Sequence, residues 1–387
     1  MLALAAATAL SGACYAGPDG AQEDGVTVRD SAGVALVHNA HQNPPSDCIV
    51  IAAEPKLTIA PSPTDGSAYP ALYRVLGAAL LDDGTIVLLN AGTKQLLFFS
   101  ESGEYQRAVG GEGRGPGEFV GPDWFGRGKG DTLFVWDTRL RRLSVFSATG
   151  EFVTSGPVPL RMITVRGLFA DGSFLADPIS LIYVGGDGSL KRESKKFQRY
   201  DSGIDEANHL ADGMANEWVD GENGPYSLPF GKSGLFAAHE MFLVVADNAA
   251  AVLRYYDLQG QLSRLVSWAS DLIPVTDQDK RNYLEHHAAD FTGGERQRGN
   301  TLFADERPRF SAIKSSRTGW LWVREFAAAW EPPESWLVFD EDGSLQCRVE
   351  MPSRFSVREV GEDHIIGVQR NEFEEESVVL FNLNRNY

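Results

Sequence analysis

Short runs of hydrophobic residues, separated by polar turns, recur along this chain in a fixed order. In the clearest copy, residues 86–89 are followed by a turn and by residues 96–99, and an Asp-Gly pair precedes the first run. Residues 133–137 and 142–147 repeat the same order. Because these runs are rich in β-branched and aromatic residues and are bounded by Asp, Gly and Ser, each copy predicts two strands and their turns.

The hydrophobic residues in these runs occupy consecutive positions, so both faces of each strand are expected to be buried. A hairpin buried on both faces must lie between two neighbours, as a blade does in a propeller. Four looser copies follow, at residues 171–176 with 197–203, 241–248 with 252–257, 320–323 with 336–340, and 364–368 with 378–382. Six copies predict an all-β fold, a six-bladed β-propeller.

The sixth copy has no residues left for an outermost strand before the chain stops at Tyr387. Residues 55–60 form a strand-like segment ahead of the first copy, in the position that residues 106–110 occupy ahead of the second. We therefore expect residues 57–59 to complete the blade made by residues 355–383. Closing the ring in this way removes the exposed sheet edges that invite aggregation.

The connection between the first two copies is the Gly-rich stretch at residues 110–119, with the sequence GGEGRGPGEF. It resembles the blade-connecting loop of bacterial NHL-like six-bladed β-propeller proteins, and residues 29–34 resemble the lead-in of the same group. The resemblance covers about residues 28–387. It implies the propeller fold and an exported protein or lipoprotein, without a defined ligand.

Residues 270–310 interrupt the repeat. Thr276 and Asp279 form a weak capping box, and hydrophobic residues after them fall on one helical face. We predict a short helical insertion near residues 276–291 that docks on the propeller and ends at Gly293 and Gly294.

The chain has 387 residues and a formal net charge of −18. Length alone would allow two domains, but repeats that must bury one another's faces favour a single ring. An acidic surface repels phosphate backbones, so nucleic acid is not expected as a partner. Past the N-terminus, no stretch reaches the roughly 20 apolar residues of a membrane helix.

The N-terminus predicts export. Residues 2–10 are small and apolar and lead to Cys14, as in a lipoprotein signal, with Ala16 as the rival cleavage point. The expected organisation is a signal over residues 1–16, a tether and lead-in over 17–45, and the propeller over 46–387. The protein would be periplasmic or an outer-membrane lipoprotein, touching the membrane only through a lipid on Cys14.

Two further cysteines, Cys48 and Cys347, remain if Cys14 is lipidated or removed. Cys347 is expected on the outer strand of the fifth blade, and Cys48 precedes the strand that closes the sixth. In an oxidising compartment they would pair, or they would stay as two unrelated thiols.

We expect the ligand-binding residues at the ends of strands. In a propeller, the turn between the second and third strands of a blade and the connection to the next blade emerge on the same side. That side would gather polar groups around one mouth, where Arg114 and Arg139 would bind carboxylates. The predicted ligand-binding set is Arg114, Glu118, Asp137, Arg139, Asp247, Asn248 and Glu325, beside Asn90 and Lys94. The alternative is that these side chains satisfy turn backbone and solvate loops.

Two other motifs do not predict a specific site. The Gly-rich loop lacks the Lys-Ser or Lys-Thr of a phosphate cradle. His286 and His287 are adjacent and would point about 100° apart on a helix, so no metal ligands are assigned.

Two classes of function remain. The first is an exported binding or scaffold module that presents its mouth to a peptide, a glycan or an envelope protein. The alternative is a lactonase-like hydrolase or a lyase with an axial divalent ion such as Ca²⁺, held by oxygen ligands from several blades.

Overall fold

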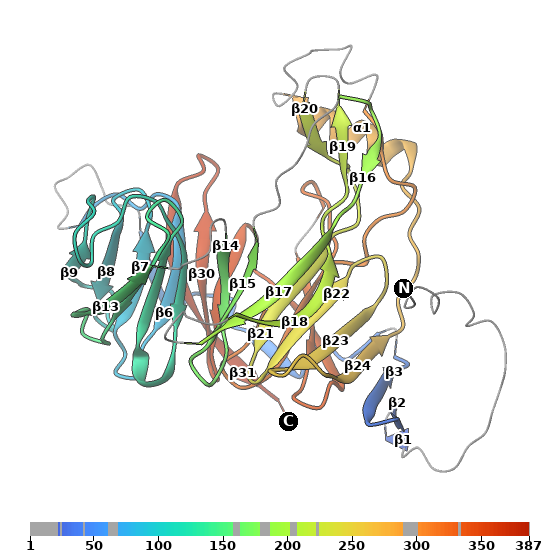
Figure 1. The fold of residues 1–387 in the computed structure, drawn as a ribbon, viewed down its shortest axis with the longest axis horizontal. Coiled ribbons are helices and arrows are strands. Elements are labelled where there is room, and N and C mark those ends of the chain that lie inside the picture. Colours follow the sequence, from blue (N-terminus) through green and yellow to red (C-terminus); the bar gives the residue numbers. More distant parts are fainter. Residues whose placement is uncertain are drawn as a thin grey trace.

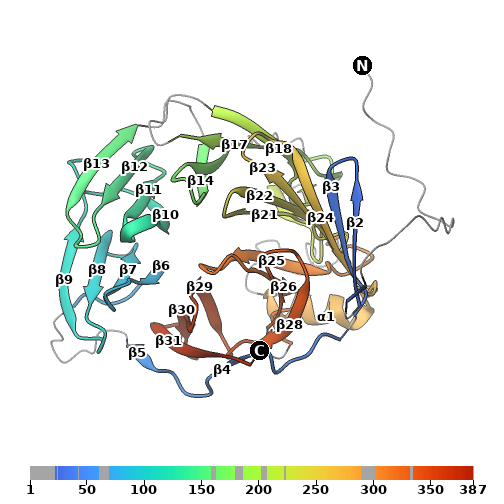
Figure 2. The same cartoon turned by 90° about the horizontal axis from the view of Figure 1, so that it is seen from below.

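The computed structural model describes residues 22–23, 25–41, 43–60, 69–157, 163–178, 186–201, 207–221, 224–288, 301–331 and 334–386. The chain is a six-bladed β-propeller, and Figure 2 shows its blades standing around a central axis. The six copies in the sequence correspond to the six blades. The N-terminal signal with Cys14 lies outside the described residues.

Each blade is an antiparallel sheet whose first strand lies nearest the axis. Blade one consists of β6 (Val75–Leu80), β7 (Ile86–Asn90), β8 (Gln95–Phe99) and β9 (Tyr105–Gly110). Blade two consists of β10 (Pro122–Arg127), β11 (Leu133–Asp137), β12 (Arg142–Phe146) and β13 (Phe152–Pro157). Blade three consists of β14 (Ile163–Leu168), β15 (Phe174–Pro178), β17 (Ser194–Tyr200) and β18 (Ala207–Met214).

The second half of the ring follows the same plan. Blade four consists of β21 (Gly234–His239), β22 (Phe242–Asp247), β23 (Val252–Asp257) and β24 (Leu262–Trp268). Blade five consists of β25 (Phe310–Ser315), β26 (Leu321–Glu325), β27 (Ser335–Phe339) and β28 (Leu345–Glu350). Blade six begins with β29 (Phe355–Val360), β30 (His364–Arg370) and β31 (Glu376–Arg385).

The consecutive hydrophobic positions of β7 pack alternately on the two neighbouring blades. Leu88 belongs to a buried cluster that includes Ile366 of blade six. Val87 belongs to another cluster, which includes Val135 of blade two. Because successive side chains of a strand point to opposite faces, a strand buried between two blades needs apolar residues at every position.

The ring closes where the sequence predicts. Strand β5 (Leu57–Ile59) pairs antiparallel with β31, with Ile59 opposite Val378 and Leu57 opposite Leu380. A second N-terminal strand, β4 (Ile49–Ile51), pairs with the far end of β31. The outer strand of blade six is therefore made of two separate pieces of the N-terminal segment.

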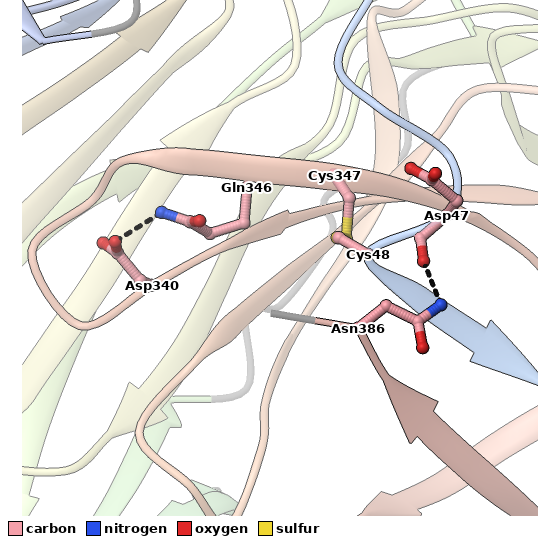
Figure 3. The surroundings of a disulfide bond; sticks show 6 residues. All are labelled: Asp47, Cys48, Asp340, Gln346, Cys347 and Asn386. Carbon is pink, nitrogen blue, oxygen red and sulfur yellow. Dashed lines mark hydrogen bonds between the residues drawn. A yellow bond between two sulfur atoms is a disulfide. The ribbon is translucent and has the colours of Figure 1, made fainter.

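A disulfide bond joins Cys48 to Cys347 of β28, with their Cα atoms 6.1 Å apart (Figure 3). Beside it, the side-chain amide of Asn386 donates a hydrogen bond of 2.7 Å to the carbonyl of Asp47. Of the two alternatives that the sequence leaves open, pairing is the one observed. The N-terminal segment is thus fastened covalently to blade five and by hydrogen bonds to blade six.

Residues of the predicted lead-in add a hairpin to the outside of blade four. Strands β2 (Val26–Ser31) and β3 (Val34–Asn39) pair with each other, and β3 pairs in parallel with β24. The short β1 (Gln22–Glu23) pairs with the start of β2. Blade four thereby becomes part of a seven-stranded sheet.

The interruptions of the repeat form a projection on one side of the ring, at the upper right of Figure 1. It contains a small sheet of β16 (Leu190–Lys191), β19 (Trp218–Gly221) and β20 (Gly224–Ser227). It also contains the predicted helix, α1 (Asp277–His286), which begins with a complete capping box of Thr276 and Asp279. Gly293 and Gly294, the predicted stop, lie outside the described residues.

The projection is held to the propeller by aromatic contacts. The ring of Phe230 contacts Tyr283 of α1 and, on blade five, Phe326 and Trp330.

In the part of the chain that the structure describes, no helix is long and apolar enough to cross a membrane.

Candidate functional site

The two ends of the ring differ in the loops that they carry. Turns between the first and second strands of each blade emerge at one end, which we call the first-turn face. Turns between the second and third strands, and the connections between blades, emerge at the other end, the second-turn face. All strand-end residues that the sequence singles out belong to the second-turn face, where the projection also lies.

Asp137 ends the second strand of blade two and is fully buried. Its carboxylate accepts hydrogen bonds from the backbone N–H groups of Val120 (2.7 Å), Gly121 (2.9 Å) and Leu140 (2.7 Å). It thus binds the incoming connection from blade one and its own turn. All of these partners are backbone groups, as the turn-satisfying alternative requires.

Asn90 and Asn248 do the same for blades one and four. Asn90 accepts from the N–H of Tyr73 and donates to the carbonyl of Ala71, both at 3.0 Å. Asn248 accepts from the N–H of Ser233 at 2.7 Å and donates to the carbonyl of Phe310 at 2.9 Å. An amide or carboxylate at this repeated position fixes the chain as it enters a blade.

The Gly-rich connection is held by its own residues and by blade two. Gly110 and Gly111 have φ values of +89° and +134°, in the region of backbone conformation that favours glycine. Glu118 accepts a hydrogen bond from the N–H of Gly115 at 2.7 Å. The guanidinium of Arg142 donates to carbonyl groups of the loop, including that of Arg114, whose own side chain is exposed.

Arg139 is exposed and lies over Gly121, so Arg114, Glu118, Asp137 and Arg139 all lie where the connection meets blade two. The other predicted residues lie on other blades. Asp247 pairs with Arg192 at 2.9 Å, Lys94 pairs with Glu112, and Glu325 accepts two hydrogen bonds from Arg348 at 2.7 and 3.0 Å. Within the described ranges, no hydrogen bond or ion pair joins the blade-two group to Asp247, Asn248 or Glu325.

A pocket of about 480 Å³ lies on the first-turn face, and blades two to five all contribute to it. Phe134, Leu168, Phe169 and Ala238 supply its apolar surface. Lys129, Asp171, Glu240 and Arg317 supply exposed charged groups. Because these blades surround the axis, the pocket is an axial mouth.

The charges of the mouth are distributed around its rim. Lys129 lies on the first turn of blade two, within the 3₁₀ turn Lys129–Asp131, and Arg317 lies on the first turn of blade five. In a ring of six blades these two are opposite each other. Neither side chain forms an ion pair with another described residue, whereas Asp171 is paired with Arg199 at 2.8 Å.

Arg127 limits the mouth on the side of blades one and six. Its side chain is only 3% exposed and donates to Asp131 (2.6 Å), to the carbonyl of Leu80 (2.5 Å) and to Glu359 (3.3 Å). It also pairs with Asp82. A buried guanidinium with three carboxylates is held in one orientation, so this side of the mouth is rigid.

His239 lies beside the mouth on blade four. Its Nδ1 is 2.8 Å from the hydroxyl of Ser315, which lines the mouth. Burial, assisted by the charge of Arg264, lowers the pKa of His239 to about 4. The imidazole is therefore neutral at neutral pH.

No three His, Cys, Asp or Glu side chains among the described residues are arranged so that they could hold a metal ion.

The turns of the first-turn face, such as residues 82–84, 129–131 and 171–172, can be recognised in the sequence. There they indicate only where one strand ends and the next begins. Nothing in their composition distinguishes the mouth from an ordinary turn. The sequence singles out strand-end Asp and Asn residues instead, and the side chains of Asn90, Asp137 and Asn248 bind backbone groups.

Comparison with known proteins supports the fold. A family model described as "6-bladed beta-propeller" (DUF5128) matches residues 76–168. No curated protein matches the sequence. Among solved structures, a member of the DUF4221 family from Bacteroides vulgatus is 12% identical with a TM-score of 0.53, over 88% of this chain and 100% of that one.

Two further solved structures are similar. A candidate exported protein from Bacteroides fragilis is 12% identical over 91% of this chain and 99% of its own, with a TM-score of 0.49. A gluconolactonase from Xanthomonas campestris is 12% identical over 87% of this chain and 98% of its own, with a TM-score of 0.43. At such identities the likeness concerns the fold alone. The class is a six-bladed β-propeller closed by its N-terminal segment.

Proposed function

We propose that this protein is an exported binding module that holds its ligand in the axial pocket of the first-turn face. The observation that carries the proposal is the pocket itself, at about 480 Å³ and built by four blades. Its volume lies within the range of ligand sites, and an apolar surface with a few polar groups is their usual lining.

The lining also indicates the kind of ligand. Phe134 and Phe169 offer apolar contact, while Lys129, Glu240 and Arg317 offer charges of both signs. Such a rim suits a peptide, a glycan or a segment of an envelope protein more than a lipid. The net charge of −18 argues against nucleic acid.

Export is part of the proposal. Structural disulfides persist in oxidising compartments, and the bond between Cys48 and Cys347 is buried at Cys347. The apolar residues 2–10 agree with an export signal. We propose a lipid anchor on Cys14, so replacing Cys14 by Ser should release the protein from membranes in cell fractionation. Full-length protein in the cytoplasm would contradict export, and unchanged membrane association would contradict the anchor.

The test of the site compares the two faces. Purified protein is screened on peptide and glycan arrays, and the ligands found are titrated against variants. Replacing Lys129 and Glu240 by Gln should weaken binding at least about tenfold, and Arg114→Ala with Arg139→Ala should leave it unchanged. The reverse result would assign the ligand to the second-turn face, around the strand-end residues that the sequence singles out.

A further inference from the structure

A side pocket of about 400 Å³ opens next to the axial one, on the first-turn face between blades four and five. Phe242, Tyr255 and Arg264 line it. Glu240 and Arg317 line both pockets, so the two meet at these side chains. A ligand longer than the axial pocket would extend into this second space.

Tyr255 carries an unused donor in the wall of the side pocket. The residue is 1% exposed, and its hydroxyl is buried without a hydrogen-bond partner in the described parts of the chain. Burial raises the pKa of this phenol, which therefore keeps its proton. An unpaired buried hydroxyl is costly, and a ligand oxygen that accepts from it would remove the cost.

Arg317 supplies a free cation at the junction. Its turn is fixed by backbone hydrogen bonds from Arg317 to Val360 and from Ser316 to Trp320. Its guanidinium is exposed and forms no ion pair with a described residue, whereas Arg264 is already bound to the carbonyl of Glu341 and to Asp342. Arg317 and Tyr255 line the same pocket, and a free planar guanidinium together with an unpaired hydroxyl matches a carboxylate.

The axial pocket favours a different part of the ligand. Phe134, Leu168 and Phe169 would contact apolar side chains, and sugar hydroxyls placed there would lose their hydrogen bonds to water. Glu240, exposed at the junction, would accept from backbone amides. Apolar side chains, amide donors and a carboxylate occur together at the end of a peptide.

We propose that the ligand is a peptide whose free C-terminal carboxylate is bound by Arg317 and Tyr255 in the side pocket, with apolar residues before it in the axial pocket. This inference rests on the proposed function, because it needs the axial pocket to be the binding site. An acidic oligosaccharide would present the same carboxylate but not the apolar part, and is an outcome of the test.

The experiment uses the full chain and three probes in fluorescence polarisation. The first probe is a set of labelled hexapeptides with apolar residues and free C-termini, and the second is the same set with C-terminal amides. Trigalacturonic acid is added as an unlabelled competitor. The variants are Arg317→Gln, Tyr255→Phe and Lys129→Gln, with Arg281→Gln on the exposed surface of α1 as the matched control.

Free C-termini should bind, and amidation should weaken binding at least about tenfold. Arg317→Gln should have a similar effect, and Arg281→Gln none. Tyr255→Phe should weaken binding without lowering the melting temperature, because it removes only an unpaired hydroxyl.

Equal binding of acids and amides, binding that Arg317→Gln does not change, displacement by trigalacturonic acid at lower concentration, or no peptide binding would each overturn the inference. Peptide binding that depends on Lys129 but not on Arg317 would overturn it and leave the proposed function standing. Peptide binding that depends on neither would overturn both.

Discussion

Cys48 and Cys347, 299 positions apart in the chain, are joined across the seam between blades five and six. The loop that this bond closes contains most of the propeller. A cross-link that spans so long a loop restricts the unfolded chain strongly.

Cys48→Ala should therefore lower the free energy of unfolding by about 2–5 kcal/mol. Chemical unfolding under non-reducing conditions measures the loss. Adding a reductant should lower the stability of the unmodified protein by a similar amount and leave the variant unchanged. A variant as stable as the unmodified protein would show that the bond contributes nothing.

The closing strand offers a second prediction. Ile59 is 3% exposed and packs in the cluster of Val378 and Leu380, while the neighbouring Thr58 is exposed. Ile59→Ala should cost about 2–5 kcal/mol of stability, because it leaves a cavity in the last interface of the ring. Thr58→Ala, the matched control, should stay within about 0.5 kcal/mol. Equal effects of the two would argue against closure by β5.

Asp137 should be required for stability. Asp137→Ala leaves three backbone N–H groups of blade two and its connection without their acceptor, so we expect a loss of at least about 2 kcal/mol. Arg139→Ala, two positions away and exposed, serves as the control and should change stability little. Thermal unfolding of both variants is the measurement, and a stable Asp137→Ala protein would contradict the assigned contacts.

His239 should make the fold sensitive to acid. The pKa of His239 is about 4 in the folded protein, against 6.5 for an ordinary histidine. Between pH 4 and pH 6.5 this histidine is therefore protonated in the unfolded chain and neutral in the folded one. Above pH 6.5 the histidine is neutral in both states and does not affect stability. As the pH falls from 6.5 to 4, the free energy of unfolding should fall by about 3 kcal/mol. His239→Asn should flatten this part of the profile of unfolding free energy against pH. An unchanged slope would mean that other groups cause it.

Much of the fold was predictable because it depends on local pattern. Residues 86–89 are apolar at every position, as expected of a strand that is buried on both faces. The strand-like segment ahead of the first copy was assigned to blade six through residues 57–59, and β5 pairs there with β31. The hairpin β2–β3 on blade four was not predicted, because its parallel pairing with β24 joins residues far apart in the sequence.

The ligand-binding set that the sequence singles out stays a prediction, and the pocket of the first-turn face was not predicted at all. Strand-end residues such as Asn90 and Asp137 have the composition of a binding site, but their hydrogen bonds go to backbone. The axial pocket is built from turn residues such as Lys129 and Arg317, which carry no distinctive pattern.

The sequence by itself determined the number of blades, their order and the closure of the ring, because each follows from short hydrophobic runs and the turns between them. Only the tertiary structure decided that Cys48 pairs with Cys347 and that Glu240 and Arg317 meet at two pockets. The physical reason is distance along the chain. Strand formation depends on neighbours a few residues away, whereas a site at the axis depends on how separate blades are placed around it.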